Sequence, residues 1–401
     1  MKEIRGGITA PLGFLAAGIH AGIKKASVLD LALVASVQEG TIAGVFTKNR
    51  VAAAPVLLDR LHLRRGIGRA IIINSGNANA CTGARGLADA EEMADLVARR
   101  MGTGSHTVFV GSTGVIGQPL PMACIRRGIP TLIKRLRRGG GAEAAQAILT
   151  TDKKTKQVAV RARIAGHMVT VGGMAKGSGM IHPDMATMLA YLTTDVAIEQ
   201  RALQQALIAA VARSFNCISV DGDTSTNDTV LCLANGIAGT PVLRAGSPAF
   251  AVFQRLLDGA CLSLAMQICR DGEGVTKVVQ VMITGARTQA DARQVAKAVA
   301  TSNLVKTALF GEDANWGRIM AAIGRSGVRM DPNRIYLAFD GVPIVKDGSG
   351  RGSLAERKIA KIVRRKEFTI TADLGQGRAT TRLWTTDLSD EYVRINATYR
   401  S

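Results

Sequence analysis

Short apolar runs alternate with amphipathic segments in the first part of the chain. Residues 70–74 (AIIIN) and 107–110 (TVFV) are continuous apolar runs bounded by Asn or Gly, a pattern typical of buried strands. Between them, residues 86–100 begin with acidic and end with basic side chains, as a helix aligned with its dipole does. We therefore predict a strand, a helix and a second strand in this order.

A hairpin is predicted in the middle of the chain. Apolar side chains recur at every second position from 158 to 164, and Ala165-Gly166-His167 separates this run from a second one at 168–171. The chain that leaves this hairpin, residues 172–195, is unusually rich in glycine. Further on, the pattern predicts helices over 198–214 and 250–268, and strands over 335–339, 368–373 and 379–383.

These elements indicate a mixed fold, α/β or α+β, with boundaries expected near residues 190 and 285. A chain of 401 residues is long enough for two or three lobes, since a domain usually takes about 100–200 residues. Hydrophobic residues make up 47% and charged residues 20%, which excludes a disordered chain or a small disulfide scaffold.

The chain is strongly basic, with a formal net charge of +20. This charge favours anionic partners, and nucleic acid, an acidic membrane and a carboxylate substrate all fit it. Aromatic residues are only 4%, which leaves little for base stacking, so we expect no nucleic-acid partner. We find no run of about 18 uncharged apolar residues and expect no membrane span.

The residues that bind metals and phosphates form no known motif. The six cysteines contain no C-x-x-C pair and the five histidines no H-E-x-x-H pair, so we predict no metal and buried thiols in a reducing, cytoplasmic compartment. Asp221 and Asp223 are expected to form Asx turns. There is no P-loop, no dinucleotide-binding glycine motif and no G-x-S-x-G elbow.

The best candidate for chemistry is the glycine-rich segment after the hairpin. Lys176 stands in the sequence Lys-Gly-Ser-Gly, where glycines let the backbone approach a carboxylate or oxyanion closely. Thr187 follows at the predicted start of a helix at 188–190, and its ordinary interpretation is an N-cap. Alternatively, its hydroxyl attacks the Ala186 carbonyl, and the cleaved chain then begins with a nucleophilic threonine.

Residues 176–189, KGSGMIHPDMATML, resemble the signature of the ornithine acetyltransferase (glutamate N-acetyltransferase) family of arginine biosynthesis. Segments similar to this family occur along essentially the whole chain. They are GGITAPLGFLAAGIHAGIK (6–24), NSGNANACTG (74–83), GSTGVIGQPLP (111–121), VDGDTSTNDT (220–229), RDGEGVTK (270–277), DANWGRI (313–319) and DLSDEYVRINATYRS (387–401).

The resemblance implies a self-cleaving enzyme with Thr187 as nucleophile. Cleavage between Ala186 and Thr187 would give an α chain, residues 1–186, and a β chain, residues 187–401, while Thr113 and Gly114 would form the oxyanion hole. Both products would build an αββα-like layered core, the β chain through residues 187–284, and residues 285–401 would form a smaller C-terminal α+β lobe. An α2β2 assembly is expected.

The resemblance also implies which residues bind substrate. They are Thr150, Lys176, Thr187, Glu273, Asn396 and Ser401, the last two on a C-terminal tail that reaches the active site. We expect Lys176 to pair with the substrate α-carboxylate and Glu273 with the δ-ammonium of ornithine. Taken alone, Glu273 is a solvated turn residue, and Asn396 and Ser401 belong to a frayed terminus.

The implied reaction transfers an acetyl group from N2-acetylornithine to glutamate by a ping-pong mechanism through an acetyl-threonine. It needs no cofactor. Some family members also use acetyl-CoA as donor, and the sequence leaves this open. The main alternative is an amidase or aminopeptidase with an N-terminal nucleophile, in which water is the acceptor. A basic nucleic-acid-binding protein is the less favoured alternative.

Overall fold

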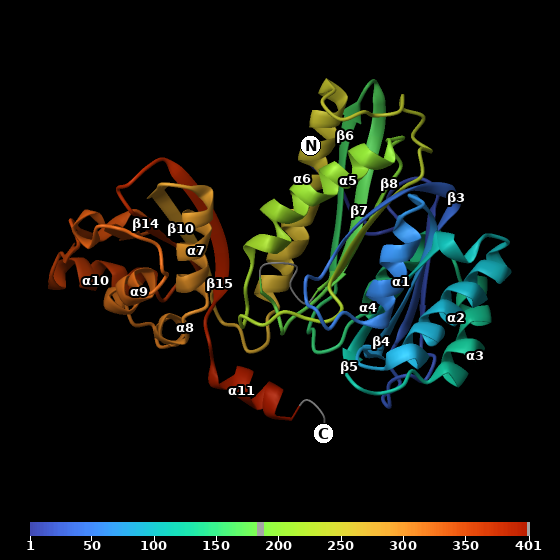
Figure 1. Ribbon diagram of the computed structural model, residues 1–401, viewed down its shortest axis with the longest axis horizontal. Coiled ribbons are helices and arrows are strands. Elements are labelled where there is room, and N and C mark those ends of the chain that lie inside the picture. The colour runs from blue at the N-terminus through green and yellow to red at the C-terminus, as the bar shows by residue number, and fades with distance from the viewer. Residues whose placement is uncertain (183–187, 399–401) are drawn as a thin grey trace. The chain divides into compact units, whose positions relative to one another are not determined.

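The computed structural model describes residues 1–182 and 188–398, which form two compact units. The first unit contains residues 1–180, 188–216 and 223–268 of the described chain, and the second contains 181–182, 217–222 and 269–398. The boundary expected near residue 285 falls inside a strand, β10, whereas the longest segment of the second unit begins at Cys269. Figure 1 labels the elements of both units.

A nine-stranded sheet forms the centre of the first unit, in the order β1-β6-β7-β8-β9-β3-β4-β5, with β2 paired to β3. Its strands are β1 (Lys2–Glu3), β2 (Phe14–Ile19), β3 (Leu31–Phe46), β4 (Ile67–Asn77), β5 (Val108–Val115), β6 (Lys156–Ile164), β7 (His167–Lys176), β8 (Leu189–Thr194) and β9 (Thr229–Ala234). The strands predicted at 70–74 and 107–110 are confirmed within β4 and β5.

The long strand β3 joins the two halves of this sheet. Its first part pairs with β2 and β4, its register shifts between Ala35 and Gly40, and its last part pairs with β9. Side chains from both halves meet in one apolar cluster, which includes Phe14, Val34, Ile71, Met174, Tyr191 and Leu231. The two halves therefore face each other as the inner two layers of the unit.

Helices cover the outer face of each half (Figure 1). On one side lie α1 (Ala54–Leu63), α2 (Gly83–Met101) and α3 (Met122–Lys134), which share a second apolar cluster with β2–β5. On the other lie α5 (Gln200–Arg213) and α6 (Pro248–Arg270). Gly173 of β7 faces Leu264 of α6, whereas its neighbour Met174 faces the inner cluster. The short helix α4 (Gly141–Ala147) packs against β2 and β3.

This arrangement confirms the mixed fold and the layered core. Segments on both sides of residue 187 contribute to it, since β7 precedes that residue whereas β8, β9, α5 and α6 follow it. The predicted hairpin is confirmed as β6 and β7, which turn at Ala165 and Gly166 with φ values of 48° and 87°. Two positive φ values give the turn that matches the twist of a tight hairpin.

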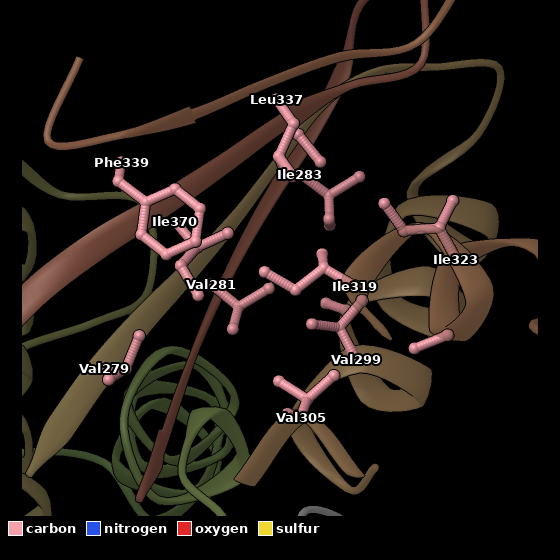
Figure 2. Close-up of a cluster of buried hydrophobic side chains, with 14 of the residues drawn as sticks. Val279, Val281, Ile283, Val299, Val305, Ile319, Ile323, Leu337, Phe339 and Ile370 are labelled. Atoms are coloured by element: carbon pink, nitrogen blue, oxygen red, sulfur yellow. The ribbon is translucent and has the colours of Figure 1, made fainter. Parts of the chain in front are cut away.

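The second unit packs its helices against a six-stranded sheet of order β13-β12-β11-β14-β10-β15. Its strands are β10 (Val278–Ala286), β11 (Tyr336–Phe339), β12 (Val342–Lys346), β13 (Ser349–Gly350), β14 (Glu367–Asp373) and β15 (Ala379–Thr386). Its helices are α7 (Gln289–Ala300), α8 (Asn303–Phe310), α9 (Trp316–Gly324), α10 (Ser353–Ile362) and α11 (Asp390–Ala397). Figure 2 shows its core, where Val281 and Ile283 of β10 lie beside Ile319 of α9.

The expectation that the thiols are buried needs correction. Only Cys232, Cys261 and Cys269 are buried, whereas Cys81 is exposed and the other two thiols are half-buried. The pattern of apolar flanking residues does not separate a buried thiol from one at the edge of an element. In the described residues one helix, α6, is long and apolar enough to cross a membrane, but it packs on the sheet as a core helix does.

Candidate active site

Thr113 and Gly114 lie at the bulged end of β5. Strand β5 continues beyond the predicted run at 107–110 to Val115, because its backbone pairing with β4 continues through small residues. The register shifts around Gly76 and Asn77. Gly114 has a φ of +135°, and a Cβ there would lie 2.3 Å from the carbonyl carbon of Gly76. Only glycine fits, and such a bulge redirects backbone groups out of the ladder.

Buried polar side chains brace this strand end. The hydroxyl of Ser112 donates to Oδ1 of Asn74 at 2.6 Å. The Asn227 amide donates to the carbonyl oxygens of Ala78 and Ser112 at 2.6 and 2.8 Å. Because buried polar groups pay a large penalty when unpaired, this network holds the backbone next to Thr113 in one arrangement.

Lys176 brings the predicted residues of the first unit together. It is the last residue of β7 and is only 4% exposed. Its ammonium donates to Oγ1 of Thr150 at 2.7 Å and to Oγ1 of Thr113 at 3.4 Å. The side chains of Thr113, Thr150 and Lys176 therefore meet at the Lys176 ammonium, although 63 residues separate Thr113 from Lys176.

Asp152 is a member of this cluster that the sequence analysis missed. Its side chain is fully buried, lies 3.8 Å from the Lys176 ammonium and is hydrogen-bonded to the Lys156 ammonium. The N–H groups of Gly177 and Thr150 donate to it at 2.7 and 3.1 Å. Burial alone would raise the pKa of Asp152, but the charges of Lys176 and Lys156 outweigh burial and hold that pKa well below its ordinary value. In the sequence, the four-residue spacing of Asp152 and Lys156 was the local sign of this ion pair.

The expected cleavage site, Ala186 and Thr187, lies outside the described residues, as does Ser401. The chain is described again from Met188, and the helix predicted at 188–190 is wrong, because Leu189–Thr194 is strand β8. This strand is buried at every position and pairs with β7 and β9. A buried segment between two strands can form backbone hydrogen bonds on both of its edges, whereas a single helical turn would leave some of these groups unpaired.

Asp228 holds the start of β8 and was also missed. Its Oδ1 accepts the N–H of Met188 at 3.0 Å, while the Met188 carbonyl accepts the N–H of Thr229 at 3.2 Å. Oδ2 of Asp228 has no hydrogen-bond partner within residues 1–182 and 188–398. Burial raises the pKa of Asp228 well above its ordinary value, so the neutral acid is favoured.

Glu273 and Asn396 meet within the second unit. The Asn396 amide donates to Oε2 of Glu273 at 2.9 Å, and Glu273 is only 7% exposed. Glu273 is therefore not a solvated turn residue, and Asn396 lies on α11 rather than in a frayed terminus. The hydroxyl of Ser389, the N-cap of α11, donates to the Gly274 carbonyl at 2.7 Å and fixes the helix on the Glu273 turn.

Asp221 also supports this arrangement, through partners that differ from an Asx turn. Its Oδ1 accepts the N–H of Ile181 at 2.9 Å, and the Tyr392 hydroxyl of α11 lies 3.2 Å from Oδ2. Within the described part of the chain, no three His, Cys, Asp or Glu side chains form a group that could hold a metal ion.

Comparison with known proteins decides the family. The sequence model of the ArgJ family matches residues 15–401. This chain belongs to the ArgJ family. It is 50% identical to the arginine biosynthesis bifunctional protein ArgJ of Symbiobacterium thermophilum, over all of both chains, and 51% identical to that of Geobacter sulfurreducens, over 97% of this chain and 99% of the relative. The ArgJ crystal structure from Bacillus halodurans is 43% identical and covers 52% of this chain and 97% of its own, with a TM-score of 0.50.

Membership of the ArgJ family confirms the resemblance found in the sequence. It also explains why segments distant in the chain carry that resemblance. The segments at 74–83, 111–121 and 220–229 contain Asn74, Ser112 and Asn227, which form the buried network behind Thr113. Relatives named for arginine biosynthesis agree with an enzyme of amino-acid metabolism and not with a nucleic-acid-binding protein.

Proposed function

We propose that this chain is a glutamate N-acetyltransferase that moves the acetyl group of N2-acetylornithine to glutamate. Family membership supports the acyltransferase class. The observation that carries the proposal is the buried Lys176 ammonium beside Thr113 and Thr150, which provides a cation for an amino-acid carboxylate at the bulged end of β5. A buried lysine binds a carboxylate more strongly than an exposed one, because water competes less.

The first step in this proposal is self-cleavage. The Thr187 hydroxyl attacks the Ala186 carbonyl carbon, the C–N bond breaks, and an ester links Ala186 to Thr187 Oγ. Water hydrolyses that ester and leaves a carboxylate on Ala186 and a free amine on Thr187. Asp228 supports the role of Thr187 in this proposal, because it fixes the N–H of Met188, the next residue along the chain.

Acetyl transfer then uses the same hydroxyl. The Thr187 α-amine, directly or through water, takes the proton of Oγ, which attacks the acetyl carbonyl of N2-acetylornithine. The Gly114 N–H and the Thr113 hydroxyl stabilise the oxyanion, and ornithine leaves with the proton. The α-amine of glutamate takes the acetyl group from the threonine ester and regenerates the enzyme.

The remaining predicted residues act on the substrate in this proposal. Lys176 and Thr150 bind the α-carboxylate that both substrates carry, and Glu273 binds the δ-ammonium of ornithine. Asn396 and Ser401 are further substrate-binding residues in this proposal. Use of acetyl-CoA as a second donor is consistent with the word bifunctional in the names of the relatives. A cytoplasmic α2β2 assembly without a cofactor completes the proposal.

The test is the intact mass and N-terminal sequence of the freshly purified protein, beside Thr187→Ala and Thr187→Ser. We expect two fragments, the larger beginning Thr-Met-Leu-Ala, from the unchanged protein and from the Ser variant, which keeps a hydroxyl. The Ala variant should stay whole. A folded, unchanged protein that remains at 401 residues would contradict the nucleophile.

Product analysis separates the proposal from the amidase alternative. With N2-acetylornithine and glutamate present, the transferase forms N-acetylglutamate faster than free acetate. An amidase would release acetate at a rate that glutamate does not change, because water is its acceptor.

A further inference from the structure

A buried carboxylate fixes the loop that precedes β3. Asp30 is fully buried, and its two oxygens accept four successive backbone N–H groups, from Ala21 at 2.6 Å, Gly22 at 3.2 Å, Ile23 at 2.7 Å and Lys24 at 3.0 Å. Its own carbonyl accepts the N–H of Ser75 in β4 at 2.9 Å. Such a nest of N–H groups around one anion leaves the backbone of Lys24 little freedom.

The side chain of Lys24 runs from this loop towards Thr150. It passes over Gly76, where an added Cβ would come within 2.8 Å of Lys24 Cγ, and Gly76 pairs with Gly114 of the proposed oxyanion hole. The Lys24 ammonium donates to the Leu149 carbonyl at 2.6 Å, with the Leu29 carbonyl at 3.5 Å. It therefore lies beside the residue that precedes Thr150, while Lys176 binds Thr150 itself.

The charges around Lys24 favour an anion. Its ammonium has three N–H donors but only two acceptors among the described residues, both uncharged carbonyls, and no described carboxylate forms an ion pair with it. Burial lowers the pKa of Lys24; the carboxylates of Asp30 and Asp152 oppose this shift, and the nearby Lys176 adds to it. The negative charge of Asp152 does not neutralise Lys176 alone, because Asp152 also forms an ion pair with Lys156. A carboxylate ligand would relieve the repulsion between Lys24 and Lys176.

We propose that Lys24 is a second cation of the acceptor site and binds the side-chain carboxylate of glutamate. The inference rests on the function proposed above, in which Lys176 takes the α-carboxylate common to both substrates. Glutamate has a second carboxylate two methylene groups away, whereas N2-acetylornithine ends in an ammonium. A half-buried lysine next to Thr150 therefore distinguishes the acceptor from the donor.

The experiment compares Lys24→Met with Lys25→Met, the exposed neighbouring lysine, as matched control. Initial rates are measured with glutamate and with glutamine, which has the same shape but no side-chain charge. In Lys24→Met we expect the KM for glutamate to rise about tenfold or more, and the preference for glutamate over glutamine to fall by a similar factor. Ornithine release in the donor half-reaction should stay within about twofold of the unchanged protein.

Lys24→Gln separates binding from a structural role. Glutamine keeps an N–H donor for the Leu149 carbonyl, so this variant should fold and self-cleave even if Lys24→Met does not, and it should still lose the preference for glutamate. Lys24→Arg keeps the charge and should retain part of that preference.

The measurements distinguish failure of the proposed function from failure of the role proposed for Lys24. If the unchanged protein forms no N-acetylglutamate, the proposed function is wrong. If it does, but Lys24→Gln keeps the glutamate-to-glutamine preference, or weakens both acceptors and the donor equally, Lys24 does not bind the side-chain carboxylate and this inference is overturned.

Discussion

Two buried carboxyl groups of the first unit, Asp152 and Asp228, have opposite chemistry. Asp152 faces two ammonium groups and two N–H groups, and its pKa is held far below the ordinary value. Asp228 accepts the N–H of Met188, and no described cation forms an ion pair with it. Burial raises its pKa and outweighs the opposing effects of its hydrogen bonds and of the Lys176 charge. Equal burial therefore gives a charged group in one place and a neutral acid in the other, because the partners decide which form is stable.

The difference matches what each group supports. Charged Asp152 orients Lys176, and the cluster of one carboxylate and two ammonium groups remains positive, which suits the substrate carboxylate that we propose. Neutral Asp228 anchors the start of β8 without adding a negative charge beside Met188. A second carboxylate there would weaken the attraction between Lys176 and an anionic substrate.

The largest expected effect is that of Asp152→Ala. Removing the carboxylate takes away a negative charge that two buried ammonium groups share, which should destabilise the fold by about 3–5 kcal/mol. The measurement is the free energy of unfolding in urea. Asp95→Ala is the control, since Asp95 forms only an exposed ion pair with Arg99 and should cost little. A loss equal to that of the control would show that the Asp152 cluster adds nothing to stability.

The second prediction concerns Asp228, where two variants should differ in stability. Asp228→Asn keeps the shape and the neutral acceptor and should change stability by less than about 1 kcal/mol. Asp228→Ala leaves the Met188 N–H unpaired and should cost about 1–3 kcal/mol and slow self-cleavage. Urea unfolding and the appearance of the two fragments measure these effects. Equal loss in both variants would mean that Asp228 acts as a charged group.

The pH dependence of stability should show opposite signs for the two groups. The folded-state pKa of Asp152 is lowered, so its contribution is present above the ordinary carboxyl pKa of about 4 and is lost as pH falls below it. The folded-state pKa of Asp228 is raised, so its contribution is present below about pH 4 and is lost as pH rises. Unfolding free energies of Asp152→Asn and Asp228→Asn, subtracted from those of the unchanged protein, should slope in opposite directions.

The smallest effect on stability is expected in the second unit. Helix α11 has no buried residue, so Asn396→Ala should change the unfolding free energy by less than about 1 kcal/mol. In the proposed function it should still raise the KM for N2-acetylornithine, because Glu273 loses its amide partner. Val393→Ala, an exposed position on the same helix, is the control for both measurements. An unchanged KM would remove Asn396 from the substrate site.

Much of the fold could be predicted from the sequence because its signals are local. The apolar run at 70–74, the alternation at 158–164 and the polarity of residues 86–100 each lie within one element, and β4, β6 and α2 follow them. The segment at 188–190 could not be predicted in this way. A short apolar run fits a helix or a strand equally well, and the ladders of β7 and β9 decide for the strand.

By itself, the sequence determined the family and the mixed layered fold, and its resemblance to the family is the source of the prediction that Thr113, Thr150, Lys176, Glu273 and Asn396 are site residues. Only the tertiary structure decided which of them meet and what surrounds them. Thr113 and Thr150 meet at Lys176 across 63 and 26 residues. Asp152 lies in none of the family-like segments, and the segments that contain Lys24 and Asp228 give no sign of the contacts these two residues make. Their roles depend on burial and on partners that come together when the sheet halves pack, and both are properties of the folded chain.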